Sequence, residues 1–274
     1  MQFFAQIGNA TRTATVRGFA LGVALFASAA EAQSPSASPD STTPPAQSAP
    51  QPAPAKAYQP VAVKLAEPAA DPTFEIFRKQ LADVVKRKDR AALQKLVVAQ
   101  GFFWEGETGD KTSKRKSSFE NFATAIGLNE KEGTGWDIIA AAAADPTLEK
   151  MEERKGVMCG PASPQIDDAA FEHLIKMTAT DAEEWGFPNA KGVEVRATAE
   201  PNAAVIETLG MHLVRVLPDD SASGNQPPTA LRVVAPSGKI GFVPVIALLP
   251  VVFDQLCYIK GSDGWKIAGY SGGE

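Results

Sequence analysis

The spacing of apolar residues changes once along the chain, near residue 190, and this change limits the folds that the chain can adopt. Before it, apolar residues recur every three or four positions, as on one face of an amphipathic helix. After it, short apolar runs of strand length follow one another, and Pro201, Gly210 and Pro218 separate them. The pattern predicts an α+β protein with a mainly helical N-terminal domain at residues 72–188 and an all-β part behind it.

The first 32 residues have the features of a secretory signal peptide. Arg12 and Arg17 precede an uncharged apolar run at residues 18–30, which ends with small residues of the kind that a signal peptidase accepts. The run is shorter than the roughly 20 residues that a helix needs to cross a bilayer, so we prefer a removable leader to a permanent anchor. We expect cleavage after Ala32 and a periplasmic or secreted protein with no permanent membrane span.

Residues 33–71 are rich in proline, serine and alanine and contain little that could be buried. Such a segment cannot recover the entropy lost on ordering, so we expect a disordered tail. It would act either as a spacer that reaches through the envelope or as a filler without a partner.

Helix-start signals recur in the segment at residues 72–188. Asp71 is placed to cap a helix whose first residue is Pro72. Ser117 and Glu120 have the spacing of a capping box. The aromatic run at residues 102–104 fits either a strand or a loop anchor. Helices are expected to begin near Asp71, Asp89, Ser117, Trp136 and Asp167.

The net charge of −5 argues against nucleic acid as a partner, because a basic face is needed to displace the counterions of phosphates. One local basic run at residues 111–116 lies next to glycine and serine, and we interpret it as a solvated loop.

Three runs in the all-β part occur in a recognisable order. Residues 192–199 contain Val-Glu-Val-Arg before small residues, residues 204–210 end in glycine, and residues 236–243 contain a Ser-Gly turn followed by Gly-Phe-Val. In this order they resemble the bacterial SH3-like (SH3b) family over about residues 192–250. The resemblance implies a small β-barrel at residues 191–250. Family members commonly bind cell-wall peptide or protein partners on aromatic-lined grooves, so the resemblance implies peptidoglycan or an envelope protein as the partner.

Two positions depart from the family pattern. Phe242 stands where the family has a tryptophan, and Leu231 stands where another aromatic residue is frequent. Residues 251–274 add a C-terminal hairpin around a turn at residues 261–264. Its Trp265 and Tyr270 would either pack on the helical domain or form an exposed binding patch with Phe242.

The two cysteines, Cys159 and Cys257, belong to different segments of a chain that we expect in an oxidising compartment. A disulfide between them is the natural inference, and two separate buried thiols are the alternative. A third reading makes Cys159 the nucleophile of a cell-wall peptidase or amidase, with His173 or His212 as its base. The Gly-Pro that follows Cys159 indicates a turn rather than the helix start typical of such enzymes.

The scattered histidines and cysteines do not form a four-ligand metal set, and we expect no metal and no cofactor. The sequence thus favours a non-enzymatic secreted cell-envelope protein that binds peptidoglycan or an envelope protein. A cysteine-dependent cell-wall peptidase or amidase using Cys159 is the alternative, and an assembly factor recognised through its tail is a further one.

Overall fold

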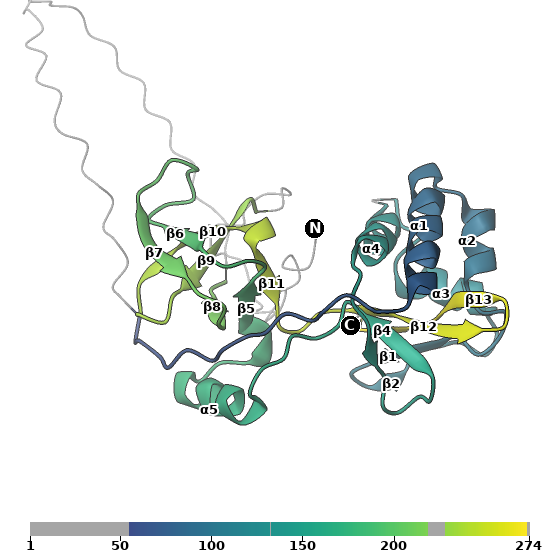
Figure 1. The fold of residues 1–274 in the computed structure, drawn as a ribbon, viewed down its shortest axis with the longest axis horizontal. Helices are drawn as coiled ribbons and strands as arrows, with labels where there is room; N and C mark the ends of the chain where they lie inside the picture. The colour runs from purple at the N-terminus through teal and green to yellow at the C-terminus, as the bar shows by residue number, and fades with distance from the viewer. Residues whose placement is uncertain (1–54, 132, 219–227, 273–274) are drawn as a thin grey trace, which may run out of the picture. The chain divides into compact units, whose positions relative to one another are not determined.

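The computed structural model describes residues 55–131, 133–218 and 228–272 (Figure 1). Within these ranges the chain forms five α-helices and two large β-sheets. The predicted leader at residues 1–32, the predicted tail up to residue 54 and the loop at residues 219–227 lie outside the described residues. Among the helices that are described, none has the length and apolar character that a membrane span requires.

The first sheet has six strands in the order β2-β1-β13-β12-β4-β3. Its centre is the hairpin of β12 (Gln255–Gly261) and β13 (Gly264–Ser271), close to the end of the chain. β1 runs parallel to β13, and β4 runs antiparallel to β12, so strands far apart in sequence are neighbours. The outer strands are β1 (Phe103–Gly106), β2 (Gly109–Asp110), β3 (Glu149–Lys150) and β4 (Val157–Gly160).

Side-chain caps set the starts of α1, α2 and α3, three of the helices that pack with the first sheet. The Asp71 carboxylate accepts a hydrogen bond from the Thr73 amide at 2.8 Å, and Pro72 is the first helical residue. Ser117 and Glu120 form the predicted capping box. Both predicted helix starts are confirmed. The helices are α1 (Pro72–Arg87), α2 (Arg90–Leu96), α3 (Ser118–Ala125) and α4 (Thr134–Ala144).

The C-terminal hairpin and the helices share one hydrophobic core. The ring of Phe74 on α1 lies edge-on to Tyr258 and to Trp265, with centroid separations of 5.3 and 5.2 Å. Leu81 on α1 and Ile267 on β13 are fully buried in the same core. Burial of these large side chains is the main force that holds helices and hairpin together.

The second sheet has seven strands in the order β11-β5-β8-β9-β10-β6-β7. Two 3₁₀ turns, Ala182–Glu184 and Val245–Ala247, precede β5 and β11, and the helix α5 (Asp168–Thr178) packs against Trp185 of β5 through Phe171. The strands are β5 (Trp185–Pro188), β6 (Val193–Arg196), β7 (Val205–Leu209), β8 (Val214–Val216), β9 (Ala230–Val234), β10 (Ile240–Pro244) and β11 (Leu248–Pro250).

Residues 55–70, which the sequence places in the tail, follow the second sheet as an ordered strap. Val61 and Val63 are buried in the cluster that contains Trp185, and Ala62 forms a β-bridge with His212. The Tyr58 hydroxyl donates to the Val234 carbonyl at 2.9 Å. The alternation of valines at 61 and 63 is the strand-like signal that the surrounding prolines and alanines obscure.

The predicted fold class is wrong. The chain is not a mainly helical domain followed by a small SH3-like barrel with an added hairpin, because two large sheets extend through the described residues and the helices are short. Residues 72–188 contribute β1 to β4 to the first sheet and β5 to the second. The supposed extra hairpin is the centre of the first sheet. Helical periodicity dominated the sequence signal because β1 to β4 are only two to four residues long.

Candidate functional site

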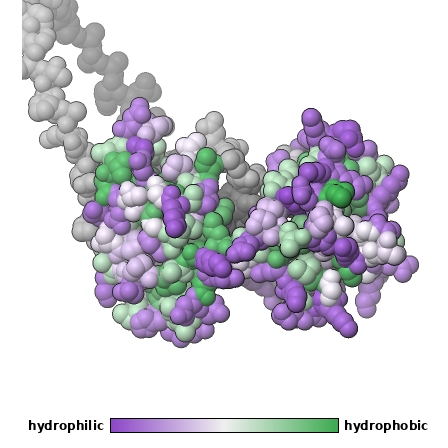
Figure 2. Space-filling model, in the orientation of Figure 1, coloured by the Kyte–Doolittle hydropathy of each residue, from purple (hydrophilic) through white to green (hydrophobic). Residues whose placement is uncertain are grey.

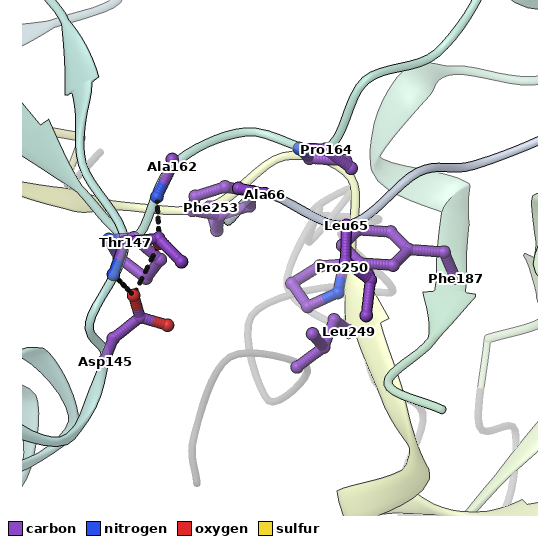
Figure 3. Close-up of a pocket in the computed structure, with 11 residues that line it drawn as sticks. Leu65, Ala66, Asp145, Thr147, Ala162, Pro164, Phe187, Leu249, Pro250 and Phe253 are labelled. Atoms are coloured by element: carbon purple, nitrogen blue, oxygen red, sulfur yellow. Dashed lines mark hydrogen bonds between the residues drawn. The ribbon is translucent and has the colours of Figure 1, made fainter. Parts of the chain in front are cut away.

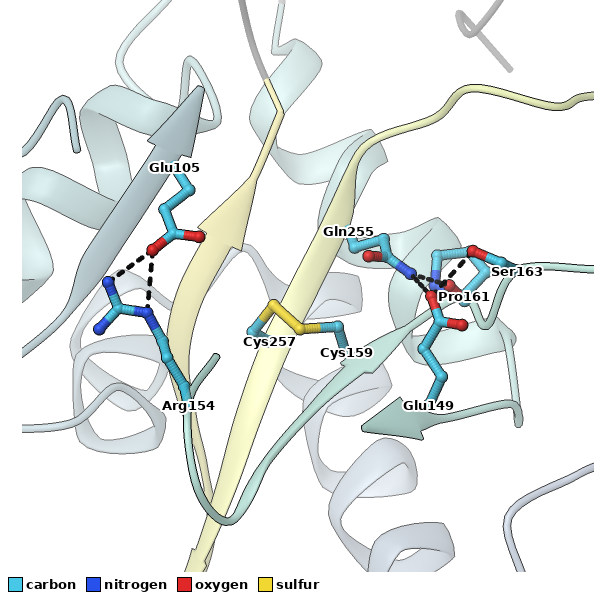
Figure 4. The surroundings of a disulfide bond; sticks show 8 residues. All are labelled: Glu105, Glu149, Arg154, Cys159, Pro161, Ser163, Gln255 and Cys257. Carbon is cyan, nitrogen blue, oxygen red and sulfur yellow. Dashed lines mark hydrogen bonds and ion pairs between the residues drawn. A yellow bond between two sulfur atoms is a disulfide. The ribbon is translucent and has the colours of Figure 1, made fainter. Parts of the chain in front are cut away.

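The two cysteines are joined, as predicted. Cys159 of β4 and Cys257 of β12 are direct register partners on adjacent strands, with their sulfurs 2.03 Å apart (Figure 4). The pair is buried among Phe103, Val157 and Ala268. In this form Cys159 carries no thiol, so it cannot supply a nucleophilic thiolate.

Polar groups surround the disulfide, and they are mutually satisfied. Arg154 donates two hydrogen bonds to one oxygen of Glu105, at 3.0 and 2.6 Å (Figure 4). Glu149 accepts from Gln255 at 2.5 Å and from Ser163 at 2.9 Å. In the described part of the chain, no group of three or more His, Cys, Asp or Glu residues is placed to hold a metal ion.

The aromatic residues considered for binding lie in different surroundings. Trp265 is 8% exposed, and its indole donates to the Thr73 hydroxyl at 3.0 Å. Tyr270 is 2% exposed and donates to Asp254; burial, followed by the Asp254 carboxylate, raises the pKa of Tyr270 well above its ordinary value. Phe242 is half-buried on β10 of the second sheet. Trp265 and Tyr270 therefore belong to the core around the hairpin and do not form an exposed patch with Phe242.

The histidines are also placed separately. His173 is exposed on α5, and His212 precedes β8, where its Nε2 accepts from the Gly210 amide at 3.2 Å. Neither histidine forms a hydrogen bond with Cys159 in the described structure. The arrangement does not create a cysteine–histidine pair.

An apolar pocket of about 210 Å³ is our candidate site in the described residues (Figure 3). It is open to solvent, and apolar groups make up most of its surface. The lining residues are Leu65, Ala66, Asp145, Thr147, Pro161, Ala162, Pro164, Phe187, Leu249, Pro250 and Phe253.

Backbone hydrogen bonds between distant segments build this pocket. Lys64 and Gln165 exchange amide-to-carbonyl bonds at 2.9 and 2.8 Å, which hold the strap beside the segment that contains Pro161 and Pro164. β11 pairs with β5, and Leu249 is the register partner of Phe187. The walls are thus supported by strand pairing rather than by side chains alone.

Several apolar side chains at and near the pocket are exposed. Leu65 is 37% exposed, Leu249 is 42% exposed, and both line the pocket. Ile246 and Val252, within three residues of Leu249 in sequence, are 58% and 49% exposed. On the face shown in Figure 2 the surface is mostly polar, with apolar residues gathered near β11. A concentration of exposed apolar residues around a concave site is typical of an interaction surface.

Sequence reasoning missed this pocket. Leu65 lies in the segment interpreted as tail, and Leu249 and Phe253 lie at the junction between the expected barrel and hairpin. The available signal was the run of apolar residues at 245–253, too long for the single short strand β11 to bury.

Comparisons of the chain with protein-family models, with curated proteins and with solved structures give no match.

Proposed function

We propose that the protein is a non-enzymatic binding protein of the bacterial cell envelope, and that its apolar pocket takes a peptide segment of an envelope protein. The signal-peptide features of residues 1–32 support export. The observation that carries the binding role is the open apolar pocket with Leu65 and Leu249 exposed in its walls.

The chemistry of the lining favours a protein over the glycan strands of peptidoglycan. Sugar hydroxyls that enter an apolar site lose hydrogen bonds to water and need polar partners in return. The pocket offers leucine, phenylalanine and proline side chains, with few polar groups. These surfaces complement aliphatic or proline side chains of an extended peptide.

The disulfide supports the non-enzymatic role over the peptidase alternative. A cysteine peptidase needs a free thiolate next to a base, whereas both sulfurs here are bonded to each other. Counting thiols in denatured, unreduced protein tests this point. We expect no free thiol. One or two free thiols per chain in protein purified from the envelope would make Cys159 a candidate nucleophile again.

The sequence of residues 192–250 resembles the SH3b family, whose members commonly bind wall peptide or protein partners. The small barrel that this resemblance implied is not found, so the proposal does not rest on it. The residues that we assign to binding are those of the pocket and not those of the family's aromatic groove. The proposal therefore does not depend on Phe242.

Selection of peptides by the mature chain, residues 33–274, tests the proposed function. A random twelve-residue phage library is panned on the wild-type protein, and selected peptides are then measured against Leu249→Asp and Phe253→Asp. A buried leucine is worth about 1.5–3 kcal/mol, so we expect each variant to weaken binding by about ten-fold or more. Ile76→Asp is the matched control, because Ile76 is 67% exposed on α1 and does not line the pocket.

Circular dichroism of each variant checks that the fold is intact. Peptides that bind wild type and the control but not the pocket variants support the proposal. Failure to select any peptide, or equal binding by Leu249→Asp, overturns it. Retention of wild type and Leu249→Asp alike on purified peptidoglycan would point to the wall polymer instead and would also overturn it.

A further inference from the structure

One carboxylate interrupts the apolar lining of the pocket. Asp145 follows the last residue of α4, and its amide donates to the Ala141 carbonyl at 3.1 Å in the last bond of the helix. The helix ends here because the backbone of Asp145 is extended and Pro146 has no amide hydrogen to donate. The side chain faces the cavity across from Leu249 and Pro250 (Figure 3). The pocket therefore combines apolar walls with a single acidic group on one side.

Hydrogen bonds fix the orientation of this carboxylate. One oxygen, Oδ1, accepts from the Thr147 amide at 2.7 Å and from the Thr147 hydroxyl at 2.5 Å. The same hydroxyl accepts from the Ala162 amide at 2.7 Å, so the network extends to the neighbouring segment that contains Ala162 (Figure 3). The second oxygen, Oδ2, points away from Thr147 toward the open space of the pocket (Figure 3). A positioned carboxylate oxygen is a strong acceptor for a cationic donor.

The electrostatic surroundings favour a cation at this oxygen. The C-terminal end of α4 carries the negative end of the helix dipole. Arg78 is the nearby cation, and it donates to the carbonyls of Ala143 and Ala144 at 3.2 and 2.9 Å. Within the described residues, no lysine or arginine nitrogen lies within 4.0 Å of the Asp145 carboxylate. A carboxylate next to apolar walls gains more from a cation than one surrounded by water.

We propose that the pocket recognises a peptide in which a proline or aliphatic residue lies next to a lysine or arginine. The apolar residue occupies the space between Leu65, Leu249 and Phe253, and the basic group pairs with Oδ2 of Asp145. This inference rests on the proposed function and adds to it the chemical class of the partner segment. The proposal also fixes the orientation of the bound peptide, because the carboxylate lies on only one side of the pocket.

Asp145→Asn is the discriminating variant. Asparagine keeps an oxygen that can accept from Thr147 but removes the charge, so the local structure is retained. Asp83→Asn is the matched control, because Asp83 is exposed on α1, away from the pocket lining. The same phage library is panned on wild type, on Asp145→Asn and on the control. We expect lysine or arginine next to an apolar residue to be enriched by wild type and by the control but not by Asp145→Asn.

A double-mutant cycle measures the pairing directly. The tightest basic peptide is compared with its Lys→Gln or Arg→Gln analogue on each protein. We expect the analogue to bind wild type about five-fold more weakly and to bind Asp145→Asn within two-fold of the basic peptide, because a charge-assisted contact is lost only in the first case. The five-fold difference should shrink between 50 and 500 mM NaCl.

The outcomes separate the two proposals. If wild type selects no peptide, or the pocket variants bind normally, the proposed function itself fails. If wild type selects peptides that need Leu249 but show no basic enrichment, or if Asp145→Asn keeps the same enrichment, only the assignment of a basic partner is overturned.

Discussion

The ring of Phe103 occupies the space in which a side chain of Gly269 would otherwise lie. The two residues are register partners on the parallel strands β1 and β13. A Cβ atom at Gly269 would collide with the Phe103 ring, and the guanidinium of Arg154 lies over that ring at 4.0 Å from its centroid. The glycine thus permits a close stack at the middle of the first sheet.

Gly269→Ala should destabilise the protein by about 1–3 kcal/mol, because the buried ring has to shift within a packed sheet. Urea denaturation followed by circular dichroism measures this free energy of unfolding. Adding Phe103→Leu to the glycine variant should recover part of the loss. A glycine variant as stable as wild type would show that the stack is not tight.

Removing the disulfide should lower the free energy of unfolding. The bond joins residues 98 positions apart in sequence. The chain-entropy model gives a stabilisation of about 4.7 kcal/mol for a loop of this length, and removal of a native disulfide typically costs about 2–5 kcal/mol. The double variant Cys159→Ala/Cys257→Ala is compared with wild type in urea. Dithiothreitol should weaken wild type to a similar extent and leave the double variant unchanged; equal sensitivity of the two proteins would contradict the prediction.

The Asp71 carboxylate should stabilise the protein above pH 4 and lose this effect in acid. Its hydrogen bond from Lys260, together with those from Thr73, lowers the pKa of Asp71 from 3.8 to about 2. A carboxyl whose pKa is lower in the folded state stabilises it when ionised, and the contribution disappears as the pH falls from about 4 to about 2.

Asp71→Asn keeps a capping oxygen but cannot form the ion pair. The stability difference between wild type and this variant should be present at pH 6 and should shrink toward zero near pH 2. Carbon-detected NMR titration of Asp71 should show its pKa rising in Lys260→Met. A difference in stability independent of pH would assign the effect to helix capping alone.

Thr180→Val should cost about 1–3 kcal/mol, although valine has nearly the shape of threonine. The fully buried indole of Trp185 donates to the Thr180 hydroxyl at 2.9 Å, and valine leaves that N–H without its acceptor. In the Trp185→Phe background the same threonine change should cost less, since no indole N–H is present. Denaturation curves of the four proteins test this; additive effects would argue against the hydrogen bond.

Local signals were readable in the sequence, whereas long-range pairing was not. The helix starts at Asp71 and Ser117 depend on side chains within three residues, and both are confirmed. The cysteine pair was inferred from compartment and number, without knowledge of the strands that carry it. β1 could not be predicted in this way, because it has only four residues and its partner β13 lies more than a hundred residues later in the sequence.

The pocket combines segments that the sequence separates widely. Leu65, Asp145 and Leu249 line one pocket because the strap bonds to Gln165 and to Pro146 and because β11 pairs with β5. None of these residues belongs to a sequence motif that would have indicated a binding site. Asp145 follows the end of α4, and only the fold places its second carboxylate oxygen beside the apolar walls of the pocket.

The position of the hairpin at the centre of the first sheet has a consequence for biosynthesis. Helices α1 to α4 are synthesised before β12 and β13, the strands that complete their core. The helices therefore cannot bury their apolar faces against the hairpin until β12 and β13 have been synthesised. A chain that stops before β12 lacks the strands that complete this core, so we expect proteases to digest it faster than the full chain.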